Sequence, residues 1–157
     1  ITITTADDGQ AARLEPGSPS SSRRFAALEA VSREGIFAGV LMMPVLPFLE
    51  DREENIREIV RRAAACGARF VYPAMGMTQR PGQREWFYRR LEEQFPGEGL
   101  AERYRRRFGS RYWCPSPRAK ELWEVFTEEC RRAGLLYQMT DIIRASRLGY
   151  QPQQLTF

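Results

Sequence analysis

The sequence predicts an α/β fold in which three parallel strands, joined by helices, are followed by a helical extension. Strand-like runs lie near residues 1–5, 36–45 and 69–75, and amphipathic helical patterns lie between them. After residue 78 the remaining patterns are helical. Alternating strands and helices are typical of right-handed βαβ crossovers, and three strands are too few to close a barrel. We therefore expect an open parallel sheet with helices packed on one side.

The first strand and helix flank a long loop. Residues 1–5 alternate apolar and β-branched polar residues with a period of two, as a strand does when one face is buried. The loop that follows contains the sequence EPG and a run of serines. Ser20 or Ser21 can cap a helix whose apolar positions recur at helical spacing, and Gly35 ends that helix.

Two further strands complete the predicted sheet. The almost continuous apolar run IFAGVLMMPVLPFL is typical of a strand buried on both faces of a parallel sheet. Residues 51–66 form an amphipathic helix that Gly67 ends, and RFVYPAMGM indicates the third strand. Residues 1–78 are therefore predicted to form the sheet and its helices.

Residues 79–148 are predicted to form a helical extension without strands. Its three main helical patterns are QREWFYRRLEEQF, GLAERYRRRFG and SPRAKELWEVFTEECRRAG, separated by Pro-Gly and Pro-Ser-Pro signals. A shorter helix is expected near residues 141–147, before a polar tail over residues 149–157.

Composition limits the chemistry that the chain can support. Its 157 residues, 43% of them hydrophobic, suit one globular domain with a core. No apolar run approaches the roughly 20 residues of a membrane span, and no secretory signal opens the chain, so we expect a cytoplasmic protein without a membrane partner. Histidine is absent and Cys66, Cys114 and Cys130 are far apart, which argues against histidine-driven hydrolysis and against a metal site on this chain.

Basic and aromatic residues are interleaved in the stretch RYRRRFGSRYW. Its arginines include Arg105, Arg106, Arg107 and Arg111. Guanidinium groups bind phosphates and aromatic rings stack on bases, so the stretch predicts a nucleic-acid-binding surface with DNA as its candidate partner. The alternative is a solvated helix face whose aromatic side chains turn inward.

The order of motifs resembles a known family. The strand ITITT, the loop LEPGSPSSSRR, a helix ending in EGI and the strand GVLMMPVLP resemble the second half of the radical SAM core in the spore photoproduct lyase and DNA repair photolyase-like group. The segments GMTQRPGQREWFYRRLEEQFPG, FGSRYWCPSP and LLYQMTDIIRA resemble the helical extension of one bacterial branch. The resemblance implies that residues 1–78 are the second half of a partial (βα) TIM barrel.

The resemblance also implies a chemistry. Enzymes of this family reductively cleave S-adenosylmethionine on a [4Fe–4S] cluster, supplied with an electron by a donor, to give a 5′-deoxyadenosyl radical. The family holds its iron–sulfur cluster with a CxxxCxxC loop, which this sequence lacks. The chain is thus expected to be the C-terminal portion of a longer, lyase-like enzyme and to be inactive alone.

Individual roles follow from the same resemblance, with no catalytic residue assigned. Thr2 and Thr4 match polar positions of the cofactor-binding strand, although the family has Asn at the position of Thr4. Arg24 matches an arginine that would clamp the methionine carboxylate, and Glu15 would fix the loop as an acceptor for Arg24. Residues 42–44 would meet the adenine.

Other functions and one further partner stay open. The chain could be a nucleic-acid-binding module, or a non-catalytic scaffold built on a degenerate barrel. The tail QQLTF resembles the pentapeptides by which bacterial repair proteins bind the replication sliding clamp. There Leu155 and Phe157 would fill an apolar pocket while Gln154 fixes the register.

Overall fold

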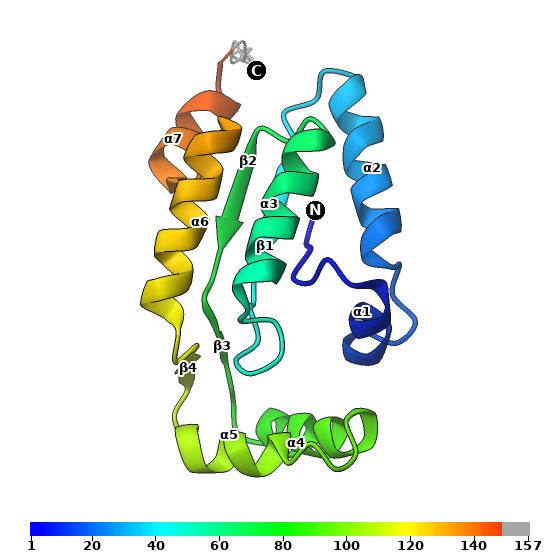
Figure 1. The fold of residues 1–157 in the computed structure, drawn as a ribbon, viewed down its shortest axis with the longest axis vertical. Coiled ribbons are helices and arrows are strands. Elements are labelled where there is room, and N and C mark those ends of the chain that lie inside the picture. The colour runs from blue at the N-terminus through cyan, green and yellow to red at the C-terminus, as the bar shows by residue number, and fades with distance from the viewer. Residues whose placement is uncertain (149–157) are drawn as a thin grey trace, which may run out of the picture.

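The structure, a computed structural model, describes residues 1–148 and has a mixed α/β fold (Figure 1). The elements follow one another as α1 (Asp8–Leu14), α2 (Ser21–Arg33), β1 (Gly39–Met42), α3 (Glu53–Ala65), β2 (Phe70–Pro73), β3 (Gly76–Thr78), α4 (Gln83–Gln94), α5 (Leu100–Phe108), β4 (Trp113–Pro115), α6 (Ala119–Ala133) and α7 (Met139–Ser146).

Parallel backbone pairing organises the larger part of the molecule. β1 and β2 form a parallel pair, as predicted, with Val40 opposite Val71. Thr2 forms one parallel bridge with Leu41, and Leu136 forms one with Phe70. Residues 1–3, β1, β2 and Leu136 therefore run side by side in the same direction.

The prediction of a three-stranded parallel sheet is wrong, because only two of the three predicted strands, β1 and β2, pair as regular parallel strands. The described residues form two separate two-stranded sheets, and residues 1–5 are not a regular strand. The amide of Ile3 donates to the carbonyl of Leu41 (3.1 Å), and the amide of Leu41 donates to the carbonyl of Ile1 (2.9 Å). The backbone carbonyl of Thr4 and the backbone amide of Ala6 instead bond to the side chain of Asn55, which lies outside the sheet. Regular strand pairing therefore ends at this point.

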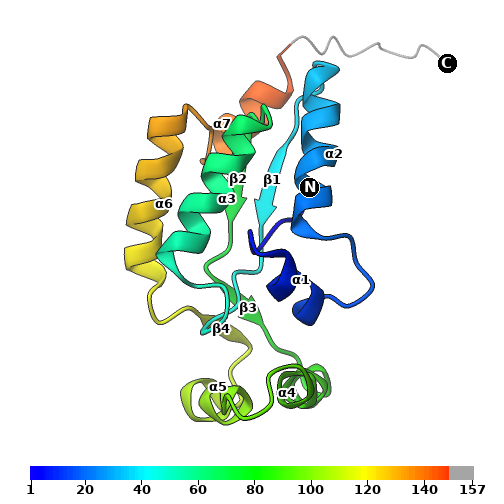
Figure 2. The same ribbon diagram turned by 45° about the vertical axis from the view of Figure 1, so that its right-hand side comes forward.

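Helices α2, α3 and α6 cover one face of the parallel segments (Figures 1 and 2). Ile3, Val40 and Val71 face these helices and are fully buried. We call this buried set the parallel core; the helices contribute to it Phe25, Leu28, Ile56, Ile59, Val60, Leu122, Val125 and Phe126. Helix α2 begins where the sequence indicated, because the Ser20 hydroxyl accepts the amide of Arg23 (3.3 Å).

The long loop after residue 5 contains a helix that the sequence analysis missed. Helix α1 has seven residues, of which only Ala11 is buried, so it carries no apolar periodicity. Its start is fixed by the carboxylate of Asp7, which accepts the amide of Gln10 (2.8 Å).

Residues 76–115 form a unit that we call the arm. It projects below the parallel segments in Figures 1 and 2. β3 and β4 are antiparallel, which corrects the expectation of no strand beyond residue 78. Gly76 is required at this crossing, because a Cβ atom there would lie 2.6 Å from the Cα atom of Pro115.

The loop between β1 and α3 connects the arm to the parallel core. The hydroxyl of Tyr104 donates to the carbonyl of Pro47 (2.6 Å). Phe48 has a left-handed backbone, with φ of 68°, and its ring packs edge-on against Tyr104 at 5.3 Å between centroids. A left-handed backbone is strained for a bulky residue. We infer that the contacts of the Phe48 ring with neighbouring aromatic rings stabilise this conformation.

Candidate functional site

Arg24 braces the outer edge of residues 1–3. Its Nη1 atom donates to the carbonyl of Thr2 (3.0 Å), its Nε atom to the carbonyl of Pro19 (3.0 Å), and its Nη2 atom to the carboxylate of Glu15. The pairing of Glu15 with Arg24, proposed from the sequence, is therefore present. Arg24 holds the loop, the first segment and the start of α2 together.

Thr2 and Thr4 have different surroundings. Thr2 is exposed, whereas Thr4 is buried and its hydroxyl donates to the carboxylate of Glu50 (2.6 Å). The side-chain amide of Asn55 donates to the carbonyls of Thr4 and Glu50 (2.9 Å each). Two residues that the sequence analysis missed, Glu50 and Asn55, thus fix the end of the first segment.

Glu50 is a buried acid that forms no ion pair within residues 1–148. Its side chain is 1% exposed, and its carboxylate also accepts the amide of Leu46 (2.8 Å). Burial raises the pKa of Glu50 to about 7, with smaller contributions from Glu15 and Asp51. Burial likewise raises the pKa of Asp51, which accepts the hydroxyl of Ser116 (2.6 Å). A titratable group near neutral pH therefore lies next to Thr4.

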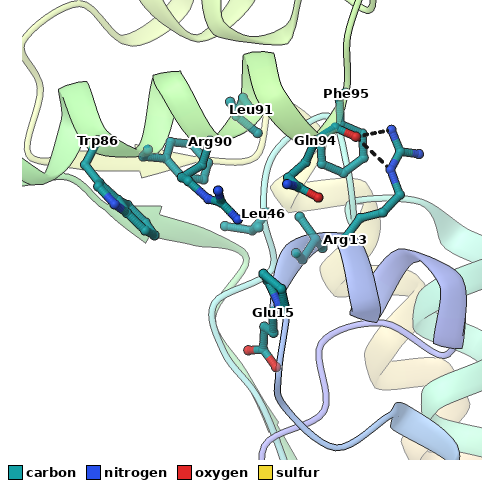
Figure 3. Close-up of a pocket in the computed structure, with 11 residues that line it drawn as sticks. Arg13, Glu15, Leu46, Trp86, Arg90, Leu91, Gln94 and Phe95 are labelled. Carbon is teal, nitrogen blue, oxygen red and sulfur yellow. Dashed lines mark hydrogen bonds between the residues drawn. The ribbon is translucent and has the colours of Figure 1, made fainter.

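An apolar groove of about 420 Å³ lies between α4 and the end of α1 (Figure 3). Leu46, Leu91 and Phe95 form part of its lining, and Trp86, which is 55% exposed, stands at one end. Polar groups at the groove come from Arg13, Glu15, Arg90 and Gln94.

The groove lies between the arm and the rest of the molecule. Arg13 crosses it by donating to the backbone carbonyl of Gln94 through Nε (2.9 Å) and Nη2 (2.6 Å), and it lies 3.8 Å from the centre of the Phe95 ring. An apolar cavity with a few polar groups is typical of small-molecule sites. The sequence analysis did not single out Trp86.

The predicted basic surface lies on the arm. Arg105 donates to the carboxylate of Glu92 (3.3 Å) and Arg106 lies 4.0 Å from that of Glu102. Within residues 1–148, Arg107 and Arg111 are exposed and their side chains form no ion pair. All four guanidinium groups are therefore unpaired or only weakly paired within residues 1–148.

The aromatic residues of this stretch divide into two groups. Tyr104 is fully buried, as the solvated-face alternative required. Tyr112 and Trp113 are 55% and 47% exposed, so they remain free to stack on a ligand.

The cysteines do not fit an iron–sulfur cluster. Cys66 follows α3, Cys114 lies in β4 and Cys130 lies in α6. Burial raises the pKa of each thiol, in the case of Cys130 to about 12. In the part of the chain that the structure describes, no three acidic, histidine or cysteine side chains gather to hold a metal ion.

Two sequence-based expectations concern the C-terminal tail and the membrane. The clamp-binding motif at Gln154, Leu155 and Phe157 lies outside the described residues. Among residues 1–148, no helix has both the length and the apolar character needed to cross a bilayer.

Comparison with known proteins finds relatives without an assigned function. Uncharacterized proteins from two strains of Mycobacterium tuberculosis and from Mycobacterium bovis are 34% identical to the chain over 92 residues, or 59% of its length. The match covers 26% of each relative, so the chain spans about a quarter of their length. No protein-family model matches the chain. No solved structure matches it either.

Proposed function

We propose that the chain is the C-terminal part of a radical SAM enzyme of the DNA repair photolyase group, and that it supplies part of the S-adenosylmethionine and substrate cavity. One observation carries the proposal: residues 1–3 align in parallel with β1 and β2. Parallel segments bring their carboxyl ends to one edge, where α/β enzymes place their sites. Thr4 and Glu50 lie at that edge, and Glu15 lines the groove near it.

Arg24 has donors left for a ligand. A guanidinium carries five N–H groups, and three bonds to Thr2, Pro19 and Glu15 leave two of them. The N–H groups left on Nη1 and Nη2 would donate to a carboxylate, which is the group at the methionine end of the cofactor. Arg24 would then position the first segment and bind the cofactor with the same side chain.

The other roles follow from position and burial. Thr4, fixed by Glu50, would offer its oxygen to the ribose or amino-acid end, and the apolar groove would exclude water around a substrate. When bound, the cofactor and an iron–sulfur cluster would supply the radical chemistry. The cysteines of this chain do not fit that iron–sulfur cluster, so its ligands would belong to the preceding part of the longer enzyme.

The test is cofactor binding by the longer enzyme that carries this segment. We expect Arg24→Ala to weaken S-adenosylmethionine binding about tenfold or more, because it removes charge-assisted hydrogen bonds, while iron–sulfur absorbance is unchanged. Arg23→Ala is the matched control, since Arg23 is the exposed neighbour on α2.

A second variant distinguishes cofactor binding by Arg24 from its structural role in holding the loop. Glu15→Ala removes a brace of Arg24 but keeps the guanidinium, so it should weaken binding less. Equal losses in the two variants would assign Arg24 a purely structural role, and unchanged affinity in Arg24→Ala would remove it from the site.

Nucleic-acid binding by the arm is the second candidate function. It is favoured by the exposure of Arg107, Arg111, Tyr112 and Trp113 on one segment. Phosphate contacts by such arginines release counterions, so binding to an oligonucleotide should weaken as salt is added. Binding without salt dependence would contradict this function.

A further inference from the structure

A second cavity lies where the first half of α4 meets the end of α5. It measures about 650 Å³ and is lined by Arg84, Tyr88, Arg89, Arg105 and Ser110, among others. The residues from α4 differ from those that line the apolar groove, so the two sites use different faces of this helix.

The cavity carries an excess of positive charge. Glu85 is its acidic lining residue, and the Glu85 carboxylate already accepts the amide of Gly82 (2.9 Å) at the start of α4. Arg105 pairs with Glu92 at 3.3 Å, but the two side chains are 48% and 57% exposed, so the pairing is weak. An incoming anion can therefore compete for Arg105.

Arg84 is held rigidly with a donor unused. Its Nη2 atom donates to the carbonyls of Ser110 (2.9 Å) and Arg111 (3.1 Å), which fixes the guanidinium against the loop after α5. Its Nε atom is buried without an acceptor. That N–H is closed to solvent, whereas the Nη1 atom of Arg84 forms no hydrogen bond within residues 1–148 and keeps two N–H groups for an oxygen ligand in the cavity.

Arg89 is free to bind. It is exposed, and within residues 1–148 its side chain forms no ion pair or hydrogen bond. Together with Arg105, whose guanidinium lies 5.0 Å from the centre of the Tyr88 ring, it adds two exposed guanidinium groups to the fixed one of Arg84. Guanidinium groups converging on one cavity match the several acceptor oxygens of a phosphoryl group.

We propose that this cavity binds a phosphoryl group through Arg84, Arg89 and Arg105. The group belongs either to a free phosphate compound or to a nucleic-acid backbone, and the second source rests on the second candidate function above. The site is distinct from the cofactor edge at Arg24 and from the apolar groove.

The probes are inorganic phosphate and a short single-stranded oligothymidine, each titrated into the full chain at constant ionic strength. We expect phosphate to shift the arginine Nε–Hε NMR signals of Arg84 and Arg105 in a saturable way, with chloride as the salt control. Arg89→Gln should weaken phosphate binding about fivefold, whereas Arg144→Gln, which removes the same charge from α7, should not.

The two ligands separate the possible results. Phosphate binding that depends on Arg89, without oligonucleotide binding, supports the site and rejects the nucleic-acid function. Binding of both ligands with the same dependence on Arg89 supports both. Phosphate binding that Arg89→Gln leaves unchanged, or the absence of a saturable phosphate response, overturns the site.

Discussion

The parallel core and the arm are stabilised by different kinds of side chain. The parallel core is mostly aliphatic, with Ile3, Val40 and Ile59 fully buried between the parallel segments and the helices. The arm is mostly aromatic and is centred on Tyr104, whose ring contacts three other aromatic rings within 6 Å at 5.2–5.6 Å between centroids. Aliphatic side chains fill a layer between regular elements, whereas rings pack in specific pairs and need partners for their polar atoms.

Arginines surround the aromatic cluster of the arm. Arg103 lies 4.0 Å from the centre of the Phe48 ring, and Arg105 lies 5.0 Å from that of Tyr88. The guanidinium groups themselves lie over the rings in cation–π contacts, and both side chains stay exposed to solvent. The difference teaches that the basic character of the arm and its stability come from the same residues, so charge changes there must be tested for stability too.

The largest expected effect comes from removing the centre of either region. Tyr104→Ala should destabilise the arm by about 3–5 kcal/mol, because it leaves a cavity and an unbonded carbonyl at Pro47. Leu28→Ala should destabilise the parallel core by about 2–5 kcal/mol. Native-state hydrogen exchange would show fast exchange confined to α4 and α5 in the first variant.

The distinction between the two regions fails if Tyr104→Ala speeds exchange equally in both of them. Equal acceleration of exchange in α3 and α4 by Tyr104→Ala would mean that the regions open as one cooperative unit. Tyr104→Phe serves as the milder control, because it keeps the ring and removes only the hydrogen bond to Pro47.

A smaller effect is expected from the buried acid that links the two regions. The pKa of Glu50 rises from 4.5 to about 7, so the folded protein holds a proton that the unfolded chain releases. Stability should therefore fall as pH rises from about 4.5 through 7, by about 3 kcal/mol in total. Glu50→Gln should remove this fall, and denaturant unfolding at pH 5 and pH 8 measures it.

The sign of this dependence is the critical result. The variant and the natural chain should be similar in stability at pH 5, and the variant should be the more stable at pH 8. A natural chain that gains stability between these pH values would show that Glu50 finds a cationic partner.

Sequence periodicity accounts for most of the parallel core. The apolar faces of α2, α3 and α6 and the run around Val40 have the spacing that predicts helices and a buried strand. The single bridges of Thr2 and Leu136 could not be predicted, because one backbone pair leaves no repeating pattern. The pairing of β3 with β4 is likewise only three residues long.

The candidate sites were predicted only in part. The loop motif indicated that Glu15 accepts from Arg24, and the structure contains that bond. The contact between Thr4 and Glu50 joins residues 46 positions apart, and neither residue carries a local signal for it. A glutamate in a run of apolar residues followed by Asp51 was the available hint of a buried acid.

The central claim, that the cofactor binds at the edge of the parallel core and not on the arm, is tested most directly by hydrogen exchange in the longer enzyme. With its iron–sulfur cluster assembled, saturating S-adenosylmethionine should slow exchange in residues 1–5 and 39–51 and leave α4 and α5 unchanged. Slower exchange confined to α4 and α5, or no change anywhere in this segment, would contradict the claim.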